Sequence, residues 1–355
     1  MERATRFLKG RGAQINPANR FHNWIYDDQP VDWDIAEEEN PQLKTQFIEV
    51  YPKTIINKVE SPDLPFSYSL NAYQGCEHGC IYCYARTTHQ YWGYSAGLDF
   101  EQKIMVKKNA PSLLEHTLKK KTWKAHTIML SGNTDCYQPA EKQFEITRQL
   151  LEVFWKYRHP VGLITKNSLI LRDLDVLEKL AANGLVHVAI SVTTLQDELR
   201  KFMEPRTATA LNRLKVIKTL SERGIPVFAM LAPIVPGLND HEVFDLTKAT
   251  AQAGALDCTF QIVRLNGEIG EIFEDWLGKT YPDRKEKVLN KIKDCHGGEL
   301  SDSRFSVRMK GEGKIAESIA AQFNLAKRIY YKDRKMPSYN LALHKQFKNG
   351  QLSLF

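Results

Sequence analysis

The stretch Cys76-Glu77-His78-Gly79-Cys80-Ile81-Tyr82-Cys83 places three cysteines at CxxxCxxC spacing in one short loop. Cysteine thiolate is the usual protein ligand of iron–sulfur clusters, so three thiolates this close can hold three irons of a cubane cluster. The fourth iron then keeps an open position for a further ligand, as the open position on a catalytic zinc does. The spacing therefore predicts a [4Fe–4S] cluster held by Cys76, Cys80 and Cys83.

Two other uses of these cysteines stay open at this point. Together with His78 or His89 they could form a Cys3His zinc site. A disulfide with one spare thiol is the second alternative, but nothing in the sequence marks the chain as secreted.

The composition is that of an ordinary soluble globular protein: 355 residues, 43% hydrophobic and 26% charged. The first residues contain no apolar signal-peptide core, and the best apolar run, 227–235, is interrupted by Pro233. Six cysteines, three of them in one loop, favour a metal site in a reducing cytosol over a disulfide framework. We therefore expect a cytoplasmic protein with no membrane partner.

The formal net charge is +7, and the basic residues gather at the two ends of the chain. The first twenty residues carry Arg3, Arg6, Lys9, Arg11 and Arg20 against Glu2 alone, and residues 327–348 carry seven basic residues against Asp333. Basic ends on a mildly basic body suggest a polyanion partner such as nucleic acid. Solvated surface is an equal alternative, since the chain shows no nucleic-acid-binding motif.

Short apolar segments alternate with helical patterns from residue 66 onward. The predicted strands are 66–73, 126–131, 161–165, 186–191, 226–231 and 256–263, and the predicted helices between them are 112–123, 141–157, 174–182, 208–223 and 241–253. Repeated β-α units of this kind predict an α/β fold with a parallel sheet. Two more helices are predicted at 282–295 and 312–330. The cysteine loop follows the first strand, where functional loops of parallel barrels lie.

The CxxxCxxC spacing, with the aromatic Tyr82 before the third cysteine, resembles the radical S-adenosylmethionine (SAM) superfamily. The resemblance implies a partial (β/α)6 barrel, with an N-terminal extension over 1–65, a core over 66–270, a helical C-terminal extension over 271–340 and a flexible tail over 341–355. It also implies that SAM binds the open iron and is cleaved reductively to a 5′-deoxyadenosyl radical. Tyr82 is then a cofactor-binding residue, and an external electron donor of the flavodoxin or ferredoxin type is expected.

Superfamily members receive the amino group of SAM in the loop after the second strand. Here that loop offers Thr134, Asp135 and Gln138, and Asp135 is the strongest acceptor for a cationic amine. The alternative is that Asp135 only shapes the turn, before Glu141 begins a helix.

Later strand ends supply the remaining candidates for SAM binding. Lys166 and Ser191 follow the third and fourth strands, where polar groups can reach a ribose or a carboxylate. Arg206 has the forked guanidinium that matches a methionyl carboxylate, although an ion pair with Glu204 is the alternative. Pro233 begins an apolar wall suited to an adenine ring, or a simple turn into the next helix.

The loops at 134–141, 165–173, 191–194, 204–206 and 233–240 resemble the spore photoproduct lyase-like branch of the superfamily more closely. An uncharacterised bacterial family in that branch also has the leader seen here at Gly10 to Phe21 and the Arg-Leu-Asn segment at 264–266. The resemblance covers roughly 10–340 and is specific for the family, but less so for the reaction.

In the lyase, the radical abstracts hydrogen from a thymine dimer in DNA, and a cysteine just before the aspartate of the second loop later returns a hydrogen. The matching positions here are Ser131 and Gly132, which carry no thiol. Cys136 and Tyr137, just after Asp135, are therefore the candidate catalytic residues for hydrogen return or radical relay.

The chain ends in Gln351-Leu352-Ser353-Leu354-Phe355, which resembles the peptide that docks bacterial repair proteins on the DNA sliding clamp. The alternative is that Leu354 and Phe355 pack on the protein's own core. A clamp would favour DNA as the substrate.

The sequence thus predicts a radical SAM enzyme acting on nucleic acid, in a reaction like the repair of a DNA lesion. Modification of RNA, a peptide or a small molecule is the alternative within enzymes. A non-catalytic nucleic-acid-binding protein stabilised by zinc or an Fe–S cluster is the alternative from another class.

Overall fold

The computed structural model describes residues 8–21 and 44–350. Its main sheet has seven strands in the order β10-β9-β8-β7-β6-β3-β2. Six of them run parallel, and β2 joins the edge antiparallel to β3. The bounds are β2 Ile56–Lys58, β3 Tyr68–Leu70, β6 Ile128–Leu130, β7 Val161–Thr165, β8 Val186–Ser191, β9 Val227–Ile234 and β10 Asp257–Ile262. Six parallel strands in sequence order confirm the predicted partial barrel.

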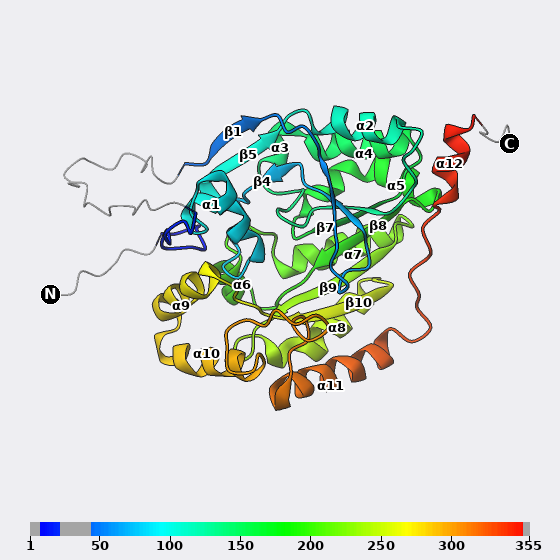
Figure 1. Ribbon diagram of the computed structural model, residues 1–355. Coiled ribbons are helices and arrows are strands. Elements are labelled where there is room, and N and C mark those ends of the chain that lie inside the picture. The colour runs from blue at the N-terminus through cyan, green and yellow to red at the C-terminus, as the bar shows by residue number, and fades with distance from the viewer. Residues whose placement is uncertain (1–7, 22–43, 351–355) are drawn as a thin grey trace.

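Helices connect the parallel strands and pack along the sheet (Figure 1). Their bounds are α2 Ala110–Lys119, α3 Glu141–Phe144, α4 Ile146–Lys156, α5 Leu174–Ala182, α6 Asp197–Met203, α7 Ala210–Glu222 and α8 Val243–Gln252, with 3-10 turns η3 Ser168–Asp173 and η4 Asp240–Glu242. Each of the longer helices buries one apolar face, as α5 does with Val176, Leu177 and Leu180. Thr209 caps α7, because its hydroxyl accepts a hydrogen bond from the Asn212 amide.

Two predicted elements are broken in the structure. The first predicted strand, 66–73, is wrong beyond Leu70, because the chain leaves the main sheet there and Tyr73–Gln74 forms β4 in a second sheet. The predicted helix at 141–157 is interrupted at Glu145, whose φ of 51° lies in the left-handed region. Both breaks occur beside the cysteine loop or the loop after β6.

The second sheet, which sequence patterns do not predict, lies beside the cysteine loop. Its order is β1-β5-β4, with β1 at Gln46–Val50 and β5 at Lys103–Lys107. Between β4 and β5 the chain forms the cysteine loop, the 3-10 turn η2, Tyr84–Trp92, and the short helix α1, Leu98–Gln102. The segments before and after the cysteine loop are thus joined in one sheet, which supports the loop.

The C-terminal helices are part of the same body as the barrel. Helix α11, Gly313–Tyr330, packs on α8, and its Phe323 lies 4.8 Å from the ring centroid of Phe260. Helices α9, Glu268–Thr280, and α10, Lys285–Asp294, lie toward the cysteine loop, with the 3-10 turn η5, Pro282–Arg284, between them. Helix α9 spans residue 270, where the boundary between core and extension was predicted.

The prediction of a flexible tail from residue 341 is wrong for residues 342–348. They form α12, Ala342–Lys348, near the end of α2 (Figure 1). Its His344 is buried and donates from Nδ1 to the Tyr157 carbonyl at 2.6 Å, and Phe347 packs edge-on against the Tyr157 ring. The predicted clamp-binding peptide, Gln351–Phe355, lies outside the described residues.

Candidate active site

The cysteine loop, residues 76–83, is fixed by hydrogen bonds along its length. The Cys76 amide donates to the Phe100 carbonyl at 2.8 Å, and the Ile81 amide to the Met203 carbonyl at 3.0 Å. The side chain of Gln138 accepts from the Glu77 amide and donates to the Gly75 carbonyl and the Thr134 hydroxyl. Gln138 and Thr134 therefore support this loop, and their predicted contacts with SAM stay predictions.

The donor set of the loop fits a metal cluster. All three cysteines carry free thiols, Cys76 and Cys80 are buried and Cys83 is partly buried. Burial raises the pKa of Cys80 and Cys83, and the ammonium of Lys166 opposes that rise. A metal that takes the place of the thiol protons is the usual way for buried cysteines to hold negative charge. Lys166 brings a cation to the site, with Nζ 6.0 Å from the centroid of the Tyr82 ring.

The two histidines considered for a zinc site have other partners. His78 faces Asp135 with Nδ1, at 3.4 Å from Oδ2, and Asn167 with Nε2, at 3.2 Å from Nδ2. Nε2 of His89 lies 3.1 Å from the Asp99 carbonyl. Because both ring nitrogens of His78 are engaged, this residue does not complete a Cys3His set.

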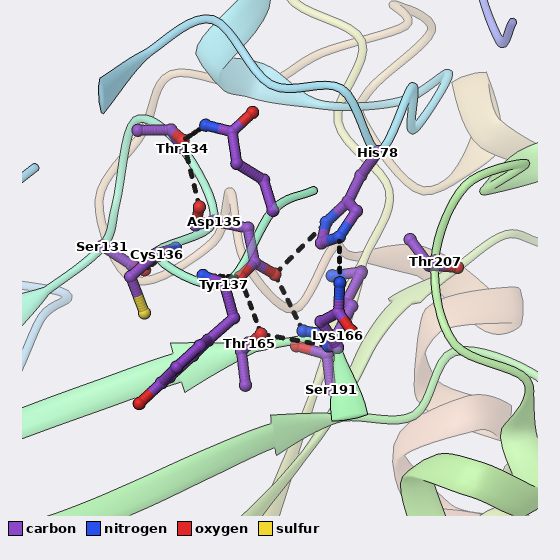
Figure 2. A network of polar contacts seen from close by, with 12 residues as sticks. His78, Ser131, Thr134, Asp135, Cys136, Tyr137, Thr165, Lys166, Ser191 and Thr207 are labelled. Atoms are coloured by element: carbon purple, nitrogen blue, oxygen red, sulfur yellow. Dashed lines mark hydrogen bonds and ion pairs between the residues drawn. The ribbon is translucent and has the colours of Figure 1, made fainter. Parts of the chain in front are cut away.

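Asp135 is the centre of the polar network in Figure 2. One carboxylate oxygen accepts from the Thr165 hydroxyl at 2.6 Å and the Tyr137 amide, and the other from the Lys166 amide at 2.8 Å. Burial raises the pKa of Asp135, but the His78 charge and these hydrogen bonds outweigh it and bring the pKa to about 2. Asp135 therefore stays ionised and orients His78 within the cysteine loop. Its predicted contact with the SAM amine stays a prediction.

The Tyr82 side chain is held by a hydrogen bond to a buried ion pair. Its hydroxyl donates to Glu204, whose other carboxylate oxygen accepts from Arg213. The Thr193 hydroxyl also donates to Glu204, at 2.7 Å. Burial raises the pKa of Glu204, but Arg213, Lys166 and the Tyr82 hydrogen bond bring it to about 2. Glu204 therefore holds Tyr82 in place as a fixed negative charge.

The alternative that Arg206 forms an ion pair with Glu204 is wrong, because Glu204 pairs with Arg213. Arg206 instead lies 3.3 Å from Oε1 of Glu77, in the cysteine loop itself. The guanidinium thus reaches the loop, and its predicted pairing with a methionyl carboxylate stays a prediction. Ser191 contributes its carbonyl to Arg213 at 3.1 Å, and Pro233 contributes its carbonyl to Asn239 at 3.1 Å. Cofactor contacts of these two residues also stay predictions.

The leader segment, residues 8–21, is locked against the cysteine loop through Glu101. The Glu101 carboxylate accepts from the Gly12 and Ala13 amides at 3.1 and 2.8 Å and pairs with Arg86 at 2.5 Å. Arg86 in turn donates to the Cys80 carbonyl at 3.0 Å. A Cβ on Gly12 would lie 1.7 Å from the Gly79 carbonyl oxygen, so only glycine fits there. Pattern analysis missed Glu101, whose role depends on partners far away in sequence.

An apolar layer covers the cysteine loop on the side of the C-terminal helices. Cys80, Ile81 and Tyr82 share one cluster of buried side chains with α9 and α10, including Phe273 and Trp276. Indole Nε1 of Trp276 donates to the Phe202 carbonyl at 3.1 Å, which joins α9 to the end of α6. This layer keeps water away from one side of the cysteines.

The two predicted catalytic residues face the hydrophobic core. Cys136 is 2% exposed, its thiol points to the Ile164 carbonyl at 3.7 Å, and Figure 2 shows the sulfur directed away from His78. The Tyr137 hydroxyl donates to the buried Asp173 at 3.0 Å. Both side chains belong to the core cluster behind the strands, so the geometry assigns them packing and does not support substrate contact.

Replacing Cys136 with alanine is therefore expected to leave the products of the reaction unchanged. The loss of one buried sulfur should lower the free energy of unfolding by about 1 kcal/mol. Product analysis by mass spectrometry checks the first expectation and denaturant unfolding the second. A changed product distribution in the variant would restore Cys136 as the hydrogen donor.

A scan against protein families matches residues 70–249 to the model described as "Radical SAM superfamily". An uncharacterised protein of Mycobacterium tuberculosis is 34% identical over 240 residues, covering 67% of this chain and 71% of that protein. An uncharacterised protein of Methanocaldococcus jannaschii is 31% identical over 250 residues, covering 70% of this chain and 88% of that protein.

Among solved structures, spore photoproduct lyase complexed with dinucleoside spore photoproduct matches with a TM-score of 0.61. The match covers 85% of this chain and 86% of the lyase at 17% sequence identity. A structure of the lyase with bound AdoMet and dinucleoside spore photoproduct also has a TM-score of 0.61, at 16% identity over 83% of this chain and 84% of the lyase. At these identities the likeness shows a shared fold. Within residues 8–21 and 44–350, the structure has no helix with the length and apolar character to cross a bilayer.

Proposed function

This chain belongs to the radical SAM superfamily and is a radical SAM enzyme, and we propose that its substrate is a nucleic acid. The observation that carries the proposal is the fold shared over 85% of the chain with a lyase whose solved complex holds a dinucleoside lesion. The basic ends of the chain support the same class of substrate.

The cysteine loop has the residues that a [4Fe–4S] cluster needs. Cys76, Cys80 and Cys83 would hold it, since all three are free and largely buried thiols of one loop, with Lys166 nearby. When bound, the cluster and SAM supply reductive cleavage of SAM to a 5′-deoxyadenosyl radical. The chain's own part is to fix the loop through Gln138 and Glu101 and to keep water from its apolar side.

The loop after β6 indicates that the return of hydrogen to the product, the last step in the lyase, differs in this protein. Ser131 and Gly132 stand where the lyase family has its thiol, and the Ser131 hydroxyl is bonded to the Ile164 carbonyl at 3.0 Å. The Gly132 carbonyl accepts from the hydroxyl of Tyr84. We therefore limit the proposal to a nucleic-acid substrate, with a lesion in DNA as the first to test. An external flavodoxin- or ferredoxin-type reductant and docking of Gln351–Phe355 on the sliding clamp belong to the same proposal.

The test is whether nucleic acid stimulates SAM cleavage. The full-length protein is reconstituted anaerobically and given dithionite and SAM. The 5′-deoxyadenosine formed is measured by mass spectrometry, first without nucleic acid and then with undamaged DNA, ultraviolet-irradiated DNA or RNA added. We expect a several-fold stimulation by one of these, together with a new mass in that nucleic acid.

Equal 5′-deoxyadenosine with and without every nucleic acid, and no change in their masses, would contradict the proposal. The enzyme would then be assigned to a peptide or small-molecule substrate. Stimulation by RNA alone would move the target from DNA to RNA.

A further inference from the structure

Arg264 follows the last parallel strand, at the same end of the barrel as the cysteine loop. The backbone on either side of it is fixed, because the Val263 amide donates to the Ile234 carbonyl at 2.9 Å and the Leu265 amide to the Leu300 carbonyl at 3.0 Å. The side chain is half-buried. Among the described residues, its guanidinium makes one long hydrogen bond, in which Nη1 donates to the Asp302 carbonyl at 3.4 Å.

The nearby carboxylates are already paired with other arginines. Asp63 accepts from Arg308 at 2.6 Å and from the Ser306 amide at 2.8 Å. The Asp302 carboxylate is held by Arg304, with Nη2 at 2.5 Å from Oδ2. Within the described part of the chain, Arg264 therefore forms no ion pair, although a guanidinium carries five N–H donors.

Burial without a counter-ion is costly for a guanidinium. Burial lowers the pKa of Arg264 and the charge of Arg308 lowers it further, and the carboxylates of Asp63 and Asp302 offset only part of this. A half-buried guanidinium with unused N–H donors is therefore suited to bind an anion. The anion would supply a negative charge and oxygen acceptors for those donors. On the same segment, the buried Oδ1 of Asn266 has no hydrogen-bond partner among the described residues.

The surroundings place this site beside the loops that support the cysteines. Gly267, at the start of α9, would meet the Thr87 side chain of η2 at 3.7 Å if it carried a Cβ. Tyr84, at the start of η2, is exposed, and its hydroxyl donates to the Gly132 carbonyl. The turn η2 thus contacts the loop after β6 through Tyr84, and the segment after β10 that carries Arg264 lies next to η2 through Gly267.

We propose that Arg264 binds a phosphate group of the substrate, a phosphodiester of nucleic acid, at the mouth of the barrel. This inference rests on the proposed function. The forked guanidinium matches two phosphate oxygens, which a lysine at this position would not. Tyr84 offers a ring face on which a base next to that phosphate can stack.

The test compares Arg264→Gln and Arg264→Lys with the wild type and with Arg223→Gln. Arg223 is a matched control, since it is exposed, pairs with Glu178 at 3.0 Å and lies between α7 and β9, at the opposite end of the strands. Fluorescence anisotropy of a labelled single-stranded oligodeoxynucleotide is measured on the full-length reconstituted protein over a range of salt concentrations. A second arm measures the shift of the thermal unfolding midpoint by inorganic phosphate.

We expect Arg264→Gln to weaken oligonucleotide binding about tenfold, as for loss of one charge-assisted contact. Its slope of log K against log salt should fall by about 0.7, the value for one phosphate on a single strand. Arg264→Lys should keep the slope and lose part of the affinity, and Arg223→Gln should match the wild type. Phosphate should raise the unfolding midpoint of the wild type and not that of Arg264→Gln.

Equal affinity and slope in the wild type and Arg264→Gln would overturn the inference and leave the nucleic-acid proposal standing. A wild type that cleaves SAM but binds no oligonucleotide would overturn the nucleic-acid proposal. In that case the unfolding measurements with inorganic phosphate test Arg264 as a phosphate site by themselves. If phosphate shifts the unfolding midpoint equally in the wild type and Arg264→Gln, or in neither, the assignment of a phosphate site to Arg264 is rejected.

Discussion

Alanine in place of Cys80 is expected to abolish SAM cleavage. Cys80 supplies one of three thiols in the loop, and no other cysteine among the described residues lies in it. With two ligands left, the cluster should not assemble, and iron and acid-labile sulfide per chain should fall to background after reconstitution. The 5′-deoxyadenosine formed from SAM with dithionite should fall with them.

The matched control for this substitution is Cys258→Ala. Cys258 is 1% exposed on β10, and its side chain packs in a core cluster that contains none of the three cysteines of the loop. That variant should keep its iron and its SAM cleavage while losing some stability. Full iron and unchanged 5′-deoxyadenosine in Cys80→Ala would instead show that the cluster is held elsewhere. Zinc in place of iron in the wild type would favour a zinc site on the same cysteines.

The parts of the fold that the sequence predicts are those set by local pattern. Strand β7, Val161–Thr165, and helix α5, Leu174–Ala182, have the predicted bounds, because each is a short apolar run or a clear amphipathic face. The cysteine ligands are predicted for the same reason, since their spacing lies within one loop. The second sheet was missed because β1 is largely exposed and carries no continuous apolar run.

The partners of the site residues could not be predicted, because they are distant in sequence. Tyr82 meets Glu204 across 122 positions, and Arg206 meets Glu77 across 129. Neighbouring charges in the sequence suggested that Glu204 and Arg206 pair with each other, whereas the fold turns them to different partners. Cys136 shows the same limit, since proximity to Asp135 in sequence does not fix the direction of its side chain.

Glutamine in place of Glu101 is expected to lower the stability of the protein strongly. Both Glu101 and its partner Arg86 are fully buried, with side-chain exposures of 0%. Removing one partner of a buried ion pair leaves an uncompensated charge, which costs about 3–5 kcal/mol in the free energy of unfolding. The carboxylate accepts from the Gly12 and Ala13 amides with its two separate oxygens, and glutamine replaces one of these acceptors with an NH2 donor.

The loss should spread from the leader segment to the cysteines, because Glu101 connects the two. Released from Glu101, residues 8–21 should become accessible to protease before the rest of the chain unfolds. Arg86, which holds the Cys80 carbonyl, should lose its fixed direction, and the reconstituted cluster should then decay faster in air. Urea unfolding, limited proteolysis and the rate of cluster bleaching measure these three effects. Glu178→Gln, which breaks the exposed pair with Arg223, is the control and should change none of them. If Glu101→Gln behaved like this control, the leader would be held by its other contacts and the cluster would not depend on it.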